Sequence, residues 1–137
     1  MISIEQTVHN DKILHKLELP FGNFYLCDHV IVAEANPETI YGLDEATMVF
    51  KKAGEFYKSI YSIKKRVYIS NRIHKYSVKP VTWISFTPAE KYLLGYCVVD
   101  SSPNGISNAL LESKFVRIPF HAATSLDEAM QWSQALI

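Results

Sequence analysis

The chain has 137 residues, of which 48% are hydrophobic and 20% are charged, and its 14 basic residues balance its 14 acidic residues. This length and composition predict one folded domain with a sizeable core and exclude a disordered chain. Proteins that bind nucleic acid through its phosphates usually carry a basic excess, so we expect no nucleic-acid partner. No apolar run reaches the roughly 18 residues of a membrane span.

The start of the chain lacks the basic and apolar regions of an export signal, which favours a cytoplasmic protein. Residues 1–11 are of mixed character, so we expect a loosely ordered N-terminus to a single domain over residues 1–137. Cys27 and Cys97 each lie in an apolar run, which indicates small buried side chains rather than a disulfide.

Three apolar stretches near the start predict strands whose short connections require antiparallel pairing. They span residues 13–19, 23–27 and 30–35. Residues 44–60 carry an apolar stripe at helical spacing, and Asp44 is the expected N-cap. Residues 66–70 are rich in β-branched and aromatic side chains and predict a further strand.

The second half alternates short strands with helices. Residues 81–86 fit a strand or an irregular segment, and residues 88–91 fit one helical turn. Residues 93–99 are apolar without alternation, as in a strand that is covered on both faces.

A helix is expected from Ser102 to about residue 114, because Ser102 is a good N-cap ahead of a proline. The side chains expected to face inward are Ile106, Ala109 and Leu110. Residues 115–120 predict a last short strand, and its proline marks it as terminal or at an edge of the sheet. The capping box at residues 125–128 begins the last helix.

A strand, a helix and another strand in succession favour parallel pairing with right-handed crossovers. The predicted fold class is therefore α/β. We expect a mixed sheet of five to six strands with an antiparallel start and a parallel core, and helices packed mainly on one face.

Three segments resemble a family of uncharacterised bacterial proteins, the SpoIIAA-like or STAS-type group. These are FGNFYLCDHVIVAE at residues 21–34, RVYISNRIHKYSV at residues 66–78 and SLDEAMQW at residues 125–132. The resemblance implies a small STAS/SpoIIAA-like α/β module. Its relatives include anti-sigma-factor antagonists and the lipid-carrying CRAL-TRIO fold.

The antagonists in this group switch by phosphorylation of a serine in an Asp-Ser-Ser-Gly-type turn that opens a helix. Here Asp100-Ser101-Ser102 is followed by Pro-Asn instead of Gly-Leu. The motif also follows the later strand, whereas the switch turn belongs after the strand that ends at Ser70. The resemblance therefore leaves open whether any serine is phosphorylated.

A polar cluster follows the strand that ends at Ser70, and we interpret it as a candidate ligand-binding or partner-binding site. It comprises Ser70, Asn71, Arg72, His74, Tyr76 and Ser77. A guanidinium suits a carboxylate or phosphate, and a histidine can titrate near neutral pH. The alternative is structural: Ser70 and Asn71 satisfy loop backbone groups, and Arg72 pairs with an acid such as Glu34.

Two weaker signals accompany this cluster. Ser101 and Ser102 at the start of a helix can hold an anion, or Ser102 can simply cap the helix. The run from Lys64 to Lys79 is basic and contains no acid, which is typical of a contact face for an acidic partner or of a solvated edge.

No catalytic or cofactor motif stands out. The five histidines make no metal-ligand spacing, so we expect no metal. The chain has no nucleophile elbow, phosphate-cradling glycine loop or dinucleotide fingerprint, so we expect no catalytic residue and no cofactor. An enzyme whose site assembles only in space stays open, but a non-enzymatic protein is favoured.

The sequence therefore favours two binding functions over catalysis. The first is a STAS-like regulatory or protein-binding module that binds a protein partner or forms a homodimer. In this function Arg72 would bind an anionic group of the partner. The second is a carrier of a small apolar or lipid-like ligand in a CRAL-TRIO-like manner, within an aromatic lining. That lining would consist of Phe21, Phe24, Tyr25, Phe56, Tyr57, Tyr76, Trp83 and Phe86. An ordinary aromatic core is the competing interpretation of the same residues.

Overall fold

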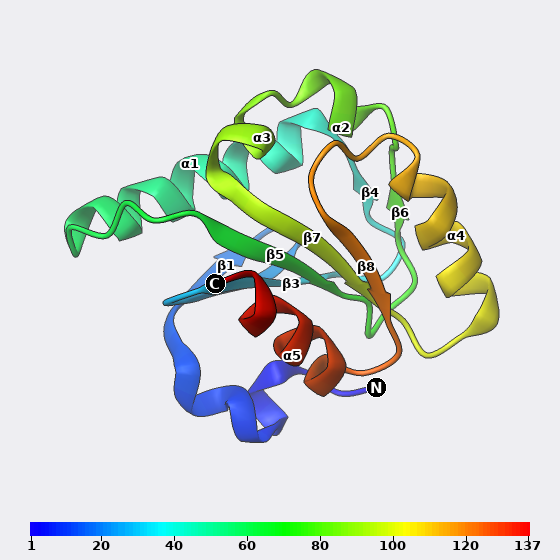
Figure 1. Cartoon of the computed structure of the whole chain (residues 1–137), viewed down its shortest axis with the longest axis horizontal. Helices are drawn as coiled ribbons and strands as arrows, with labels where there is room; N and C mark the ends of the chain where they lie inside the picture. The colour runs from blue at the N-terminus through cyan, green and yellow to red at the C-terminus, as the bar shows by residue number, and fades with distance from the viewer.

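The computed structural model describes all 137 residues, and its framework is a mixed six-stranded sheet (Figure 1). The strand order is β1-β2-β3-β5-β7-β8. The strands are β1 (Ile13–Leu19), β2 (Gly22–Cys27), β3 (Val30–Ala35), β5 (Arg66–Asn71), β7 (Leu93–Val99) and β8 (Phe120–Ala123). Pairing is antiparallel from β1 to β3 and parallel from β3 to β8. A second, two-stranded sheet pairs β4 (Ile40–Tyr41) with β6 (Ser77–Val78).

Most of the helices cover one face of the large sheet, and one lies on the other (Figure 1). The first group is α1 (Leu43–Ser59), α2 (Thr82–Ser85), α3 (Pro88–Tyr92) and α4 (Pro103–Ser113). On the opposite face lie α5 (Leu126–Leu136) and the N-terminal segment. This arrangement confirms the predicted α/β class with helices mainly on one face. None of the helices combines the length and the apolar character that crossing a membrane requires.

Alternate residues of the strands build two separate cores, because successive strand side chains point to opposite faces. In β2, Phe24 and Leu26 pack under the α1–α4 side, whereas Tyr25 and Cys27 pack on the α5 side. The central strands are therefore buried on both faces, which is why residues 93–99 are apolar without alternation.

Two expected element boundaries are corrected. The last strand is β8 at Phe120–Ala123 rather than residues 115–120, because Pro119 has no N–H to donate and contributes only its carbonyl, which accepts from Tyr96 N at 2.9 Å. The N-cap of α1 is Gly42 rather than Asp44, and its N–H donates to the Glu45 carboxylate at 2.8 Å.

The N-terminal segment is also more ordered than expected. It forms two 3₁₀ turns, at Ile4–Gln6 and Val8–Lys12. The Ile4 side chain is fully buried, and its N–H donates to Glu34 Oε2 at 2.8 Å. This corrects the expectation of a loose start, since a buried apolar side chain and a buried hydrogen bond to β3 both hold the segment.

Cys27 and Cys97 are free, and both are buried in the core on the α5 side. Burial raises the pKa of Cys27 to about 11 and that of Cys97 to about 12. Because the thiolate is the reactive form, we expect neither thiol to react with iodoacetamide at about pH 8 in the folded protein, and both to react in urea. Intact-mass spectrometry counts the adducts, and rapid labelling of the folded protein would contradict this burial.

Candidate functional site

The polar residues at the end of β5 point to both faces of the sheet, and most are buried. Ser70 and Asn71 are each 1% exposed. Asn71 Nδ2 donates to Glu34 Oε2 at 2.9 Å, the oxygen that also accepts from the N-terminal segment. Ser70 lies on the opposite face, where its hydroxyl contacts the Tyr76 hydroxyl and accepts from Arg72 Nε at 3.2 Å.

Arg72 forms a buried ion pair with Glu112 of α4. Its Nη2 lies 2.7 Å from Glu112 Oε2, and the two side chains are 10% and 4% exposed. Trp83 Nε1 and the Tyr96 hydroxyl donate to Glu112 Oε1 at 2.8 and 2.7 Å. An acid therefore pairs with Arg72, as the structural alternative expects, but the acid is Glu112 and not Glu34.

The electrostatics of this buried network favour a structural role. Burial, and then the charge of Glu112, raise the pKa of Tyr96 well above its usual value. Burial opposes the charge of Arg72, but the oxygens of Tyr96, Tyr76 and Glu112 outweigh it and raise the pKa of the guanidinium. The phenol of Tyr96 therefore stays neutral and the guanidinium stays charged across the physiological pH range.

The remaining predicted residues lie in the connection after β5 and at the start of β6. Tyr76 is half-buried against Ser70, whereas His74 and Ser77 are exposed. The structure therefore brings together Ser70, Arg72 and Tyr76, and places Asn71 on the other face of the sheet.

Ser101 and Ser102 stand at the start of α4, as expected. The Ser102 hydroxyl accepts from Gly105 N at 3.0 Å and is the N-cap of this helix. The Asp100 carboxylate accepts from Ser102 N at 2.9 Å and from its hydroxyl at 3.0 Å. A carboxylate of the chain itself thus occupies the position that a bound anion would approach.

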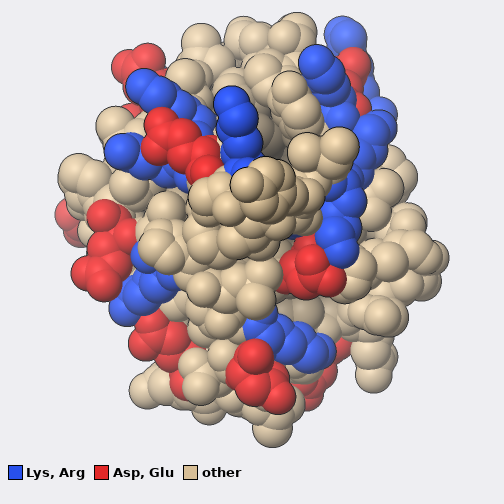
Figure 2. Space-filling model, turned by 90° about the vertical axis from the view of Figure 1, so that its left-hand side faces the viewer, with Lys and Arg blue, Asp and Glu red and all other residues tan.

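A wide groove lies between α1 and α3, with the sheet as its floor. Its volume is about 660 Å³. Its apolar lining includes Ile31, Phe50, Ala53, Tyr57, Ile63, Phe86, Tyr92 and Leu93, and its basic lining consists of Lys51, Lys58, Lys64 and Arg66. No acidic side chain lines it. The face toward which the end of α1 points is hollowed, with Lys and Arg side chains beside the hollow (Figure 2).

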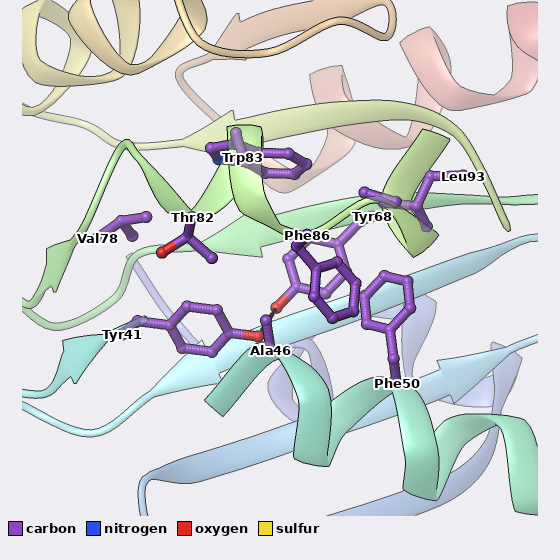
Figure 3. A pocket seen from close by; sticks show the side chains of 10 residues that line it. Tyr41, Ala46, Phe50, Tyr68, Val78, Thr82, Trp83, Phe86 and Leu93 are labelled. Atoms are coloured by element: carbon purple, nitrogen blue, oxygen red, sulfur yellow. Dashed lines mark hydrogen bonds between the residues drawn. The ribbon is translucent and has the colours of Figure 1, made fainter. Parts of the chain in front are cut away.

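A small apolar cavity of about 30 Å³ adjoins the groove and shares Phe50, Phe86 and Leu93 with it. Figure 3 shows the rings of Phe50 and Phe86 standing between α1 and the strand that carries Tyr68. The hydroxyls of Tyr41 and Tyr68 point toward one another at 3.3 Å and form a hydrogen bond, so neither polar group is left without a partner. Apolar rings therefore form the inner end of the groove.

Only part of the predicted aromatic lining borders the groove, namely Tyr57 and Phe86. Phe24 and Tyr25 lie in the two cores on opposite faces of β2, and the Trp83 ring packs on Tyr96 with centroids 4.3 Å apart. Most of the predicted lining thus belongs to ordinary core packing.

The sequence carried one overlooked signal for the groove, which is Gly54 in the middle of α1. Glycine inside a helix destabilises it by about 0.5–1 kcal/mol relative to alanine. A Cβ atom at this position would meet no atom within 4 Å, because Gly54 faces the open groove.

No group of three or more His, Cys, Asp or Glu side chains is placed to hold a metal ion. Comparison with known proteins found no match to this chain among family models, curated proteins or solved structures.

Proposed function

We propose that this protein is a non-enzymatic, STAS-like binding module that holds a small ligand with an apolar body in the groove between α1 and α3. The observation that carries the proposal is the groove itself, with its volume of about 660 Å³ and its mainly apolar floor. Ligand sites typically have volumes of about 300–1,000 Å³ and apolar walls with a few polar groups.

The buried network around Glu112 favours this site over the polar end of β5. Arg72 is already paired with Glu112, and its guanidinium is also bonded to Ser70 and Tyr96. An incoming anion would have to displace these partners. In the groove, in contrast, Lys51 and Lys58 form no ion pair, so an incoming ligand has no acidic partner of theirs to displace.

Gly54 offers a direct test, because a side chain added there projects into the groove and meets nothing else. We expect the wild-type protein to bind the neutral dye Nile red, with a rise in fluorescence. Gly54→Phe should weaken this binding by about tenfold or more, since the ring fills the space of the dye.

The matched control is Gly54→Ala, which changes the same position but leaves the groove open. It should bind Nile red like the wild type and should be more stable by about 0.5–1 kcal/mol. Undiminished binding by Gly54→Phe, or no binding by the wild type, would count against the proposed site.

A further inference from the structure

Arg66 is a buried guanidinium that has no carboxylate partner. The residue is 5% exposed, and none of the ion pairs in the structure involves it. Its Nε donates to Asp28 O at 2.9 Å, Nη1 donates to Lys64 O at 3.0 Å, and Nη2 donates to Ser62 Oγ at 2.5 Å. Three of its five N–H donors are thus used, all on neutral oxygens.

The position of this guanidinium is fixed by its neighbours. Its Cζ lies 3.3 Å from the ring centroid of Tyr57, and the Tyr57 hydroxyl donates to Cys27 O at 2.6 Å. Burial lowers the pKa of Arg66, and the nearby Tyr57 and Asp28 act against that shift. A buried charge that no carboxylate contacts directly is costly, so an anion at this place would be stabilised.

The charged side chains that line this end of the groove are all basic. Lys58 and Lys64 line it beside Arg66. The one carboxylate whose charge acts on Arg66 is that of Asp28, which pairs with Lys64 at 2.8 Å and with His29 at 3.2 Å. It is therefore already engaged, and Arg66 and Lys58 are left to attract an anion.

Three of the four basic side chains that line the groove, Lys58, Lys64 and Arg66, gather at one end of it, and Lys51 is the only one beside Phe50. Along α1 the lining runs from Thr47 and Phe50 to Lys58, so the groove extends for roughly 16 Å at the helical rise of about 1.5 Å per residue. Arg66 packs on Tyr57, the chain neighbour of Lys58, whereas Phe86 packs on Phe50 beside the small cavity. Leu93 pairs with Arg66 in the sheet and lines both the groove and the cavity, so it lies between the two ends. This order suits a molecule with a charged head and an apolar tail.

We infer that the groove binds an amphipathic molecule whose terminal oxyanion, a carboxylate or a phosphate monoester, pairs with Arg66 and Lys58. Its apolar chain lies against Phe50, Phe86 and Leu93. This inference rests on the proposed function and names the ligand class for the same groove. Arg66 supplies fixed N–H donors to the oxyanion, and Lys58 supplies a mobile charge.

The test is displacement of Nile red by three competitors with the same alkyl chain: dodecanoate, dodecyl phosphate and the neutral dodecanol. We expect at least one of the two anions to bind about tenfold or more tightly than dodecanol, and the better anion identifies the head group. Equal affinity of all three would overturn the inference and leave the proposed function standing. Failure of all three to displace the dye would count against the groove as a ligand site.

Charge-removing variants locate the head group. Arg66→Gln should abolish most of the advantage of the anion and leave dodecanol binding unchanged. Because Arg66 is buried, Lys58→Gln at an exposed position provides a second variant that does not disturb the core. Lys52→Gln is the matched control, since Lys52 is on the same helix but does not line the groove. An anion advantage that survives in both groove variants would overturn the assignment.

Discussion

Glu112→Ala is expected to lower the free energy of unfolding by about 3–5 kcal/mol, which is the cost of removing one partner of a buried ion pair. The substitution leaves Arg72 charged and nearly enclosed. It also removes the acceptor of the Trp83 N–H and of the Tyr96 hydroxyl. Urea unfolding followed by circular dichroism measures this change. A loss below about 1 kcal/mol, typical of a surface pair, would show that the pair is not buried as described.

Two further variants separate charge from hydrogen bonding in the same network. Glu112→Gln keeps an acceptor for Trp83 and Tyr96 but removes the negative charge, so it should cost less than the alanine variant. The double variant with Arg72→Met and Glu112→Leu removes both charges and should recover much of the stability, because no buried charge is left without a partner. Nile red binding should persist in Glu112→Gln, since Glu112 does not line the groove.

The sheet was predictable because each strand carries its own signal. Short connections between the first three strands required antiparallel pairing, and the unbroken apolar run at 93–99 indicated burial on both faces. Such signals depend on nearby residues alone. They therefore do not show which side chains meet across the fold.

The partner of Arg72 illustrates this limit. Leu110 was expected to face inward from α4, but it is 52% exposed, and Glu112 is 3% exposed instead. Hydrophobicity favoured Leu110, yet α4 turns Glu112 inward, where it pairs with Arg72, 40 residues away in the chain. A single sequence does not indicate which acid approaches a given arginine.

The groove was harder still to predict, because it is defined by the space between two elements. Its walls come from α1, the connection at residues 62–64, and the short helix α3. The width of the gap depends on how these elements rest on the sheet, and no local pattern encodes that distance. The aromatic residues did not reveal it either, since most of them fill the two cores.

The second large effect is expected at Gly22, where β1 turns into β2. Its φ of 153° is a conformation that residues with side chains rarely adopt, and a Cβ there would lie 2.6 Å from Glu34 O and 2.7 Å from Ala35 Cα. Both neighbours are backbone atoms of β3, so they cannot rotate away. Gly22→Ala should therefore lower the free energy of unfolding by about 3 kcal/mol, combining backbone strain with overpacking.

The same chemical change at Gly54 should have the opposite sign, because that site has helical geometry and open space around it. The two variants carry the same substitution, glycine to alanine, and differ only in its position. Thermal unfolding of both variants measures the difference in their stability. If Gly22→Ala proved as stable as the wild type, the register that places Gly22 opposite Ala35 would be wrong. The pairing of β2 with β3 depends on that register. Because Ile31 of β3 forms part of the floor of the groove, this turn also supports the proposed ligand site.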